Sequence, residues 1–416
     1  MDGPEIPPFF LCPISLLMMK DPVTISTGIT FDRENIHRWL FLYKKTTCPV
    51  TKQTLTDCSF IPNCTLQRLI DSWRAANPST SSPAESSSLV PCATISVEVA
   101  RKLMEDASSP DSGLKSLRRI KSLVKENNSN KKLMEEAGLI QVAASLVVDN
   151  YSRGLVISQF ENEIGGEESL SVLSLLDMTP EISTKLAGIG LTECLSWVLQ
   201  RGSYVARVHG VTILRSMFKV MHHNFFMDLK AELFDGVVEI LKDQNSNQAT
   251  SAALSILMEV CPWGKNRLRA VEAGVLPVII EFLAENNERK RCETLLAVLE
   301  LLCGRAEGRA AFVSHPMGVA VVSRKIFRVS HTANEKAVKV LLLVSKYSSS
   351  PELIQEMVDV GAVMKICMVL QMECHLKTKE KAREILRLHG RQWKESPCVP
   401  LNGLSSVFKA VGEMSG

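Results

Sequence analysis

The feature of this 416-residue chain that most constrains its fold is a short phrase that returns at near-regular intervals. The phrase is an apolar helix that ends in Glu or Asp, Ala or Val, and Gly, followed by a second apolar helix. Its clearest copies lie at 131–140, 266–277 and 353–363, and looser copies lie at 184–188, 233–236 and 312–318. The repeated glycine falls at positions 138, 188, 236, 274, 318 and 361, so successive glycines are 50, 48, 38, 44 and 43 residues apart.

A period of about 40 to 47 residues is typical of armadillo and HEAT repeats. In such repeats the glycine ends one helix in a left-handed conformation that other residues resist, and the chain turns into the next helix. Each repeat leaves an apolar face uncovered, so neighbouring repeats stack into a curved rod. The copy at 271–277 most resembles an armadillo repeat. We therefore expect an all-α armadillo-repeat solenoid of about six degenerate repeats over residues 95–390.

Three segments interrupt or end this pattern. Residues 151–168 hold two adjacent glycines and several acids, so we expect an inserted loop there. Residues 377–389 form a strongly charged amphipathic pattern that is expected to cap the array as a helix. The remaining residues, 391–416, are expected to be a C-terminal tail.

The composition excludes several classes of function. The net charge is only +3, which argues against a dedicated nucleic-acid-binding protein. No run of about 18 uncharged apolar residues occurs, so no membrane span is expected, and the first residues do not form a signal peptide. Twelve scattered cysteines are typical of a reduced compartment. These observations predict a cytoplasmic protein, with the nucleus as a second location.

The repeats are separated from the start of the chain by a Ser/Pro-rich stretch over residues 77–91. Such a stretch has little to bury, so we expect a flexible linker at 80–94. The linker could act as a swing arm or as a simple spacer. A separate domain is then expected at residues 5–79.

That first domain carries a series of short motifs in a fixed order: Cys12-Pro13-Ile14, Asp21-Pro22, Gly28, Asp32, His37-Arg38-Trp39, Cys48-Pro49-Val50 and Pro62-Asn63. The series resembles the U-box, the zinc-free relative of the RING domain. The resemblance implies a small α+β domain whose main use is to dock ubiquitin-conjugating enzymes. It also implies structural roles for a set of motif residues: Cys12, Pro13, Asp21, Pro22, Gly28, Asp32, Pro62 and Asn63.

The residues themselves argue against a metal in this domain. A RING domain folds around two zinc ions and needs about eight Cys or His ligands in paired spacings. Here the first eighty residues hold only four cysteines and one central histidine, and no Cys-x-x-Cys occurs in the chain. We therefore expect no metal and no cofactor, and a small core held by apolar packing and hydrogen bonds, some from charged side chains.

Local signals predict the elements of this domain. A hairpin is expected around Gly28, and Asp32 is expected to cap a helix over residues 33–42. A second helix should open at Asn63 or Thr65. Its expected apolar face, which should close the domain, consists of Leu66, Leu69, Ile70 and Trp73.

The resemblance also implies a working surface, a shallow apolar groove formed by two loops and the central helix. Its expected residues are Ile14, Leu16, Trp39, Pro49 and Val50. An aromatic anchor such as Trp39 tends to dominate a small interface, although Ile14 and Trp39 could also be core residues.

Lys52 occupies the place where many U-boxes carry a basic linchpin that bridges the conjugating enzyme and its ubiquitin. A lysine offers one mobile ammonium in place of the planar fork of an arginine, and Lys52 could also be an ordinary solvated lysine. Cys12 has no histidine close in sequence, so we expect a buried structural thiol and no nucleophile.

Together, the two parts resemble the plant U-box/armadillo-repeat ubiquitin ligases. The implied function is transfer of ubiquitin from a charged conjugating enzyme to lysines of a protein target held by the array, in stress, immune or hormone signalling. An alternative is an armadillo adaptor with a weak or inactive U-box. A nuclear-import adaptor is disfavoured because Trp197 has Arg201, in place of Asn, one turn on. A homodimer is left open.

Overall fold

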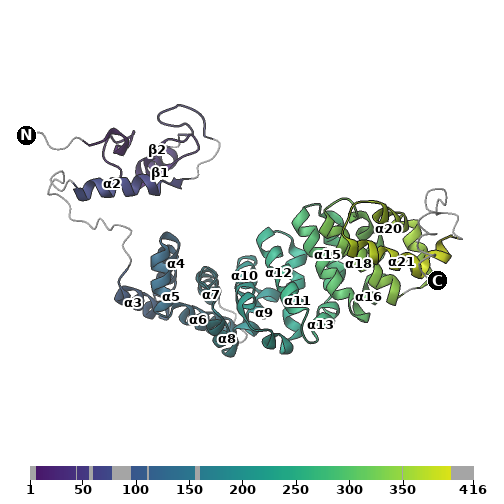
Figure 1. Cartoon of the computed structure of the whole chain (residues 1–416). Helices are drawn as coiled ribbons and strands as arrows, with labels where there is room; N and C mark the ends of the chain where they lie inside the picture. Colours follow the sequence, from purple (N-terminus) through teal and green to yellow (C-terminus); the bar gives the residue numbers. More distant parts are fainter. Residues whose placement is uncertain are drawn as a thin grey trace, which may run out of the picture. The chain divides into compact units, whose positions relative to one another are not determined.

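The computed structural model describes residues 6–43, 45–55, 60–76, 95–109, 112–154, 160–348 and 350–394. The chain divides into two compact units, 1–93 and 94–416 (Figure 1). The expected linker at 80–94 lies outside the described residues, as does the expected tail from residue 395 onward.

The first unit contains a small antiparallel sheet with strand order β2-β1-β3. Its strands are β1 (Pro22–Thr24), β2 (Thr30–Asp32) and β3 (Ile61–Pro62). The hairpin predicted around Gly28 is confirmed: Val23 pairs with Phe31, and Gly28 has the positive φ of 80° that the turn requires.

Helices cover this sheet. A short 3-10 turn, η1 (Pro8–Phe10), precedes it, and α1 (Arg33–His37) continues into the π-helical turn η2 (Arg38–Leu42), so the predicted helix over 33–42 is confirmed. The second predicted helix is α2 (Cys64–Ala76). Its predicted apolar face is right for Ile70, which is fully buried, and for Leu66 and Trp73, which contact the core. The prediction is wrong for Leu69, which is 52% exposed.

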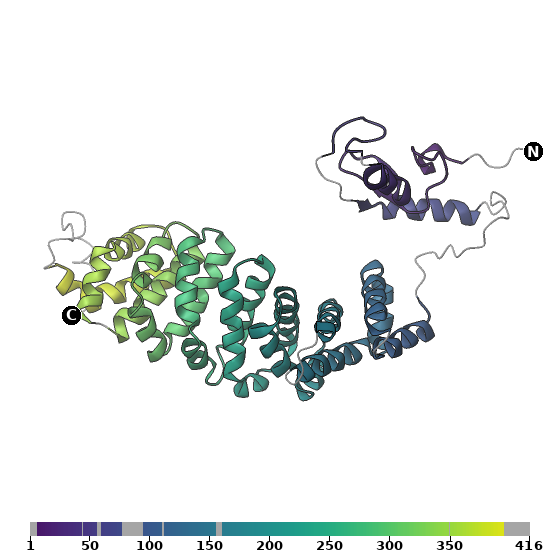
Figure 2. The same ribbon diagram turned by 180° about the vertical axis from the view of Figure 1, so that it is seen from behind.

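The second unit is entirely helical in its described residues (Figures 1 and 2). Its helices are α3 (Val97–Ala107), α4 (Gly113–Glu126), α5 (Asn128–Glu136), α6 (Leu139–Gly154), α7 (Phe160–Leu173), α8 (Pro180–Gly188), α9 (Leu191–Arg201), α10 (Tyr204–Val220), η4 (His223–Asp228), α11 (Ala231–Asp243), α12 (Asn247–Val260), α13 (Asn266–Glu272), α14 (Val275–Glu285), α15 (Arg289–Cys303), α16 (Ala306–Val313), α17 (Gly318–Lys325), α18 (His331–Tyr347), α19 (Pro351–Asp359), α20 (Ala362–Gln371) and α21 (Leu376–Lys394).

These helices form a stack in chain order, with two rows that run along it. Within one row α7 contacts α10, α10 contacts α12, and α12 contacts α15; within the other, α6 contacts α9, α9 contacts α11, and α11 contacts α14. The long helices α10, α12 and α18 begin at side-chain caps, since Ser203, Ser246 and Ser330 each accept a hydrogen bond from an amide of the first turn. One hydrophobic cluster runs the length of the stack, from Ala100 to Trp393.

The repeated glycines have more than one role. Gly138, Gly274 and Gly361 have φ of 100°, 83° and 72°, so three of the predicted left-handed turns are confirmed. In the second copy the turn is made by Gly190 and not by Gly188, which ends α8.

The predictions for two later copies are also wrong in detail. Gly236 lies inside α11, where an added Cβ would come within 2.7 Å of Cβ of Leu199, so its role is close helix packing. Gly318 opens α17 without a positive φ.

The expected inserted loop over 151–168 is wrong for most of its length, because α6 extends to Gly154 and α7 begins at Phe160. The expected helix over 377–389 is confirmed as part of α21. This helix contacts α18 and α20 and buries Ile385, Leu386 and Trp393, so it closes the apolar core at this end of the stack.

Candidate functional site

Two loops of the first unit have the same backbone design. Loop 1 (residues 11–18) is closed by a bridge between Leu11 and Met18, and loop 2 (residues 47–54) by a bridge between Thr47 and Thr54. In loop 1 the amide of Leu16 donates to the Cys12 carbonyl at 2.8 Å. In loop 2 the amide of Lys52 donates to the Cys48 carbonyl at 3.0 Å. After its first residue, each loop therefore has the order Cys, Pro, a β-branched residue and a hydroxyl residue, and the chain turns at the residue that follows.

The turn position is strained in both loops. Leu16 has φ of 55° and Lys52 has φ of 60°, a left-handed conformation that costs residues with a Cβ about 1 kcal/mol. Serine and threonine hydroxyls support it, since Ser15 Oγ accepts from the Leu17 amide and Thr51 Oγ1 accepts from the Gln53 amide, both at 3.5 Å. The two loops thus use one conformation twice.

The two loop thiols act as internal acceptors of hydrogen bonds. Cys12 is fully buried, and its Sγ accepts from the Asp32 amide at 3.3 Å. Cys48 is also fully buried, and its Sγ accepts from Thr27 Oγ1 and from the Thr51 amide, each at 3.5 Å. Burial raises the pKa of the Cys48 thiol, but these hydrogen bonds outweigh burial, and the net pKa is lowered. Each thiol thus fastens its loop to the rest of the domain.

A carboxylate supplies a further cross-link. Asp32 is the N-cap residue of the central helix, as predicted, but its carboxylate makes no capping hydrogen bond to the helix. Instead its Oδ1 accepts from the amides of Lys20 and Asp21, at 2.9 and 2.8 Å. Asp21 in turn pairs with Arg33 at 2.5 Å. The carboxylate therefore joins the segment that follows loop 1 to the start of the central helix.

Asn63 connects the sheet to the last helix of the domain. Its amide donates to the Pro22 carbonyl at 2.8 Å, and its Nδ2 donates to Thr30 Oγ1 at 3.2 Å. Its Oδ1 accepts from the Leu66 amide at 3.1 Å, so Asn63 is the cap of α2. The predicted opening of this helix at Asn63 is confirmed.

Among the described residues no group of three or more His, Cys, Asp or Glu side chains could hold a metal ion.

The five side chains of the expected groove differ in exposure. Ile14 and Trp39 are half-buried and contact the core on one side. Leu16 and Val50 are exposed, at 73% and 49%, and Pro49 is half-buried. The indole N–H of Trp39 donates to the Thr47 carbonyl at 2.8 Å, so the central helix holds the start of loop 2 directly. Exposed apolar side chains on a small domain are costly unless they contact a partner.

Two other candidates have defined surroundings. The Lys52 ammonium donates to the Pro49 carbonyl of its own loop at 2.9 Å, and the side chain is exposed. Cys12 is buried and engaged, so it cannot serve as an accessible nucleophile.

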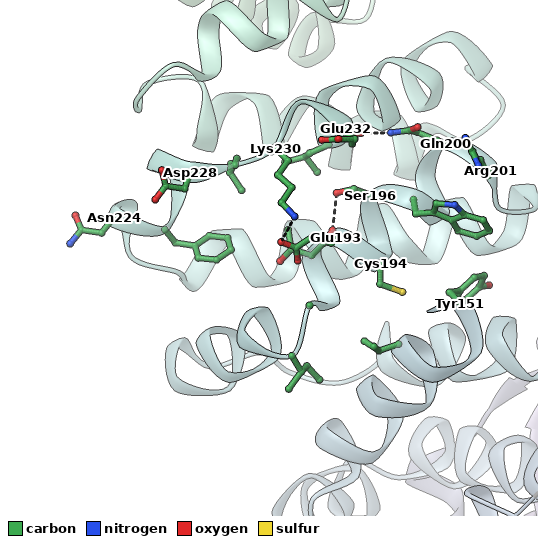
Figure 3. Close-up of a pocket in the computed structure, with 18 residues that line it drawn as sticks. Tyr151, Glu193, Cys194, Ser196, Gln200, Arg201, Asn224, Asp228, Lys230 and Glu232 are labelled. Atoms are coloured by element: carbon green, nitrogen blue, oxygen red, sulfur yellow. Dashed lines mark hydrogen bonds and ion pairs between the residues drawn. The ribbon is translucent and has the colours of Figure 1, made fainter. Parts of the chain in front are cut away.

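The helical stack contains a second site that sequence reasoning did not find. A pocket of about 820 Å³ lies where α6, α9 and α11 meet (Figure 3). Trp197 and Arg201, one turn apart on α9, are among the residues that line it. That spacing was visible in the sequence, but the other walls come from segments up to about fifty residues away. Among the described residues no helix is both long and apolar enough to cross a membrane.

Comparisons with known proteins agree with this division of the chain. The profile of the U-box domain family matches residues 6–79. The profile described as the plant U-box protein ARM repeat region matches residues 97–409.

Curated relatives match along nearly the whole chain. The E3 ubiquitin-protein ligase PUB23 of Arabidopsis thaliana is 44% identical over 406 residues, which cover 96% of each protein. The E3 ubiquitin-protein ligase PUB22 of the same plant is 43% identical and covers 96% of this chain and 97% of the relative. The U-box domain-containing protein 75 of Oryza sativa subsp. japonica is 29% identical, with coverage of 92% and 82%.

Solved structures support the fold of the helical unit alone. A structure from work on a phosphorylation switch in the interaction between cadherin and beta-catenin has a TM-score of 0.56 at 10% identity, and the match covers 80% of this chain and 58% of that one. An engineered protein has a TM-score of 0.51 at 16% identity, with coverage of 71% and 68%.

Proposed function

The chain belongs to the plant U-box/armadillo-repeat ubiquitin ligases, and from this premise we propose that its U-box docks a ubiquitin-conjugating enzyme on the surface formed by loop 1, loop 2 and Trp39. As a RING-type ubiquitin transferase it forms no covalent intermediate of its own. The conjugating enzyme carries the thioester, and the U-box restricts and orients the conjugate, which lowers the entropic cost of the reaction.

The observation that carries this proposal is the matched pair of loops. A conformation that costs free energy at both Leu16 and Lys52 is retained where apolar side chains face solvent. The Trp39 indole fixes the distance between the central helix and loop 2 through the Thr47 carbonyl. A surface that is apolar, exposed and rigidly held favours a role in binding over a role in the core.

Lys52 is the proposed linchpin between the conjugating enzyme and its ubiquitin. Its ammonium now bonds a carbonyl of its own loop, a weak surface contact that it could exchange for a partner's acceptor. A lysine bridges with one mobile charge, so its contribution should be smaller than that of the apolar residues.

The armadillo array is proposed to hold the protein whose lysines receive ubiquitin. Repeat stacks provide extended surfaces for other proteins, and the continuous apolar core makes this one a stable support. We place the reaction in stress, immune or hormone signalling on the resemblance to the family alone, and in the cytoplasm on the scattered cysteines of the chain.

The test is a reconstituted reaction with purified full-length chain, activating enzyme, a panel of conjugating enzymes, ubiquitin and ATP. Wild-type chain should build ubiquitin chains with at least one conjugating enzyme. Ile14→Ala and Trp39→Ala should lower the rate about thirty-fold or more, as expected for anchor residues of a small interface.

Two further variants separate docking from folding. Leu16→Asp places a charge on an exposed residue, and Asp tolerates the left-handed conformation there, so the fold should survive while chain formation stops. Ile61→Ala is the matched control, since Ile61 is 65% exposed but lies on the sheet edge, and it should leave the rate unchanged. Full activity in Ile14→Ala, Trp39→Ala and Leu16→Asp would contradict the docking surface, and an inactive wild type across the panel would favour the adaptor.

A further inference from the structure

Four basic side chains gather where α17 and α20 pack together in the last repeats of the array. This basic cluster consists of Arg324 and Lys325 in the last turn of α17, Arg328 just beyond that helix, and Lys365 on α20. Burial lowers the pKa of Lys325 and of Lys365, and the charges of Arg324 and Arg328 lower it further. The two arginines therefore lie near both lysines.

Part of this arrangement is structural. Three members of the basic cluster donate to carbonyls at a helix end of the preceding repeat: Arg324 to Ala284 at 2.5 Å, Lys365 to Ser323 at 2.6 Å, and Lys325 to Asn286. Such carbonyls carry partial negative charge and attract cations. This role accounts for Lys325, which is only 2% exposed. It leaves most N–H donors of the exposed Arg324 without a described acceptor, and it does not involve Arg328.

No described carboxylate balances the basic cluster. None of its members forms an ion pair with a described residue, and no described carboxylate opposes the lowered pKa of either lysine. Glu285, the last residue of α14, follows Ala284 in the chain, yet it is exposed and pairs with no described cation. On the neighbouring helix α18, by contrast, Lys336 pairs with Glu300 at 2.7 Å. Like charges held together repel, so the exposed part of the cluster favours an anionic partner.

A strained turn sets the position of Arg328. The residue before it, Phe327, has φ of 65°, a left-handed conformation that is rare for a bulky side chain. The Phe327 amide donates to Oδ1 of the buried Asn334 at 2.8 Å, so α18 holds this conformation in place. Strained backbone persists only where the surrounding structure fixes it, and such positions concentrate at functional sites. Arg328 is therefore kept in the basic cluster at a conformational cost.

An exposed apolar side chain borders the basic cluster. Met368 is 41% exposed and lies three residues after Lys365, so the two share a face of α20. A methionine adapts its shape to different apolar partners. The surface thus offers charge-assisted hydrogen bonds beside an apolar contact. That combination suits a protein segment with acidic and apolar residues better than the uniformly charged backbone of a nucleic acid.

We propose that the exposed cations of the basic cluster, together with Met368, dock an acidic segment of a partner protein. Carboxylates of the segment pair with the cations, and an apolar side chain of the segment packs on Met368. This inference rests on the proposed function, because the partner would be the target that the array holds. The net charge of the whole chain is only +3, so the attraction is local and should weaken as salt is added.

The test uses the full-length chain and two fluorescein-labelled ten-residue peptides. One carries two leucines flanked by glutamates in a Gly/Ser background, and the other has lysines in place of the glutamates. In fluorescence anisotropy at low salt, the glutamate peptide should bind about ten-fold or more tightly than the lysine peptide. Equal binding of the two peptides would overturn the proposal.

A matched pair of variants locates the binding. Arg328→Glu reverses an exposed charge that has no described hydrogen-bond partner, so the fold should survive while the glutamate peptide binds about ten-fold more weakly. Arg119→Glu makes the same change at an exposed position on α4, and it should change the affinity by less than about two-fold. Equal losses in the two variants would show that net charge, and not the basic cluster, attracts the peptide.

Two milder variants separate the charged contact from the apolar one. Arg324→Gln keeps a donor for the Ala284 carbonyl but removes the charge, and it should weaken binding of the glutamate peptide about five-fold. Met368→Ser should weaken it about three-fold and leave a leucine-free glutamate peptide unaffected. Full affinity in both variants would contradict the assigned surface.

A labelled ten-nucleotide single strand of DNA represents the competing occupant. It should bind more weakly than the glutamate peptide. Tighter binding of the DNA that is lost in Arg328→Glu would make the basic cluster a nucleic-acid site and overturn the proposal.

Ubiquitin-chain formation by the same preparations separates this inference from the proposed function. The Arg328 and Arg324 variants should form chains at the rate of the wild type, because the basic cluster lies outside the U-box. If chains form and the glutamate peptide is not preferred, the docking of an acidic segment fails alone. If the glutamate peptide binds as described but no preparation forms chains, the proposed ligase function fails and the docking surface stands.

Discussion

The U-box and the armadillo array differ in the size of their apolar cores, and therefore in how much of the fold's stability depends on each buried residue. In the described residues of the U-box only eleven apolar side chains are buried, and hydrogen bonds that the side chains of Cys12, Asp32, Cys48 and Asn63 accept from backbone amides hold the elements together. In the array one apolar cluster continues from Ala100 to Trp393. A small domain buries a smaller share of its surface and is correspondingly marginal. The comparison teaches that equal changes should have unequal consequences in the two units.

The largest effect is expected from matched core truncations. Phe31 in the U-box and Phe312 in the array are both fully buried, and replacing either with alanine costs about 3–5 kcal/mol. Phe31→Ala should unfold the U-box and abolish ubiquitin-chain formation, with most of the helical circular dichroism retained. Phe312→Ala should loosen its neighbouring repeats but leave chain formation intact. Hydrogen exchange would locate the damage, and protection lost across the whole chain in either variant would break the comparison.

The next effect concerns polar cross-links. Asp32→Ala removes the acceptor of two amides and should lower the stability of the U-box by about 2–3 kcal/mol. Asp32→Asn keeps an acceptor oxygen and should recover much of that loss. Thermal unfolding followed by Trp fluorescence would measure both, and a stable Asp32→Ala variant would show that packing alone holds the U-box.

A smaller effect distinguishes two kinds of glycine within the array. At Gly308 an added Cβ would lie 2.0 Å from the carbonyl oxygen of Leu302, so Gly308→Ala forces a helix to move and should cost about 2–3 kcal/mol. At Gly274 nothing lies within 4 Å, and Gly274→Ala should cost only about 1 kcal/mol for its positive φ. Urea unfolding should rank the two variants in this order, and the reverse order would contradict the assignment of close packing to Gly308.

The smallest effect is a pH dependence expected of the array. Burial lowers the pKa of His389 in α21 and of His209 in α10. Because the unfolded chain then binds protons more readily than the folded array, stability is full above the unfolded pKa of about 6.5 and falls as the pH drops below it. His389→Gln and His209→Gln should flatten this decline in melting temperature between pH 7.5 and 5.5. An equal decline in the double variant would rule out these two histidines as its source.

Sequence reasoning succeeded where the cause of a structure lies within a few residues. The hairpin at Gly28, the cap at Asn63 and the turns at Gly138, Gly274 and Gly361 all follow from local conformational preference. Spacing alone could not tell a turn glycine from a packing glycine, so Gly188 and Gly236 were assigned wrongly.

Long-range contacts were beyond the reach of the sequence. The partners of the Asp32 carboxylate lie eleven and twelve residues away, and a helix start offers it a nearer and equally reasonable role. The array pocket combines α6, α9 and α11, and only the one-turn spacing of Trp197 and Arg201 was visible beforehand. The docking residues themselves came from a family resemblance, because no local rule distinguishes an exposed Leu16 from a buried one.

The similarity of loop 1 and loop 2 means that the sequence of one loop could replace that of the other. Residues 12–17 and 48–53 share a backbone hydrogen bond and a positive φ at the matching turn position. A chain that carried the sequence of residues 48–53 at both positions should still fold, because that sequence makes the same turn with the same hydrogen bonds. It would, however, present an ammonium where Leu16 now presents an apolar side chain. The U-box thus uses the same turn in two loops but presents different side chains from each of them.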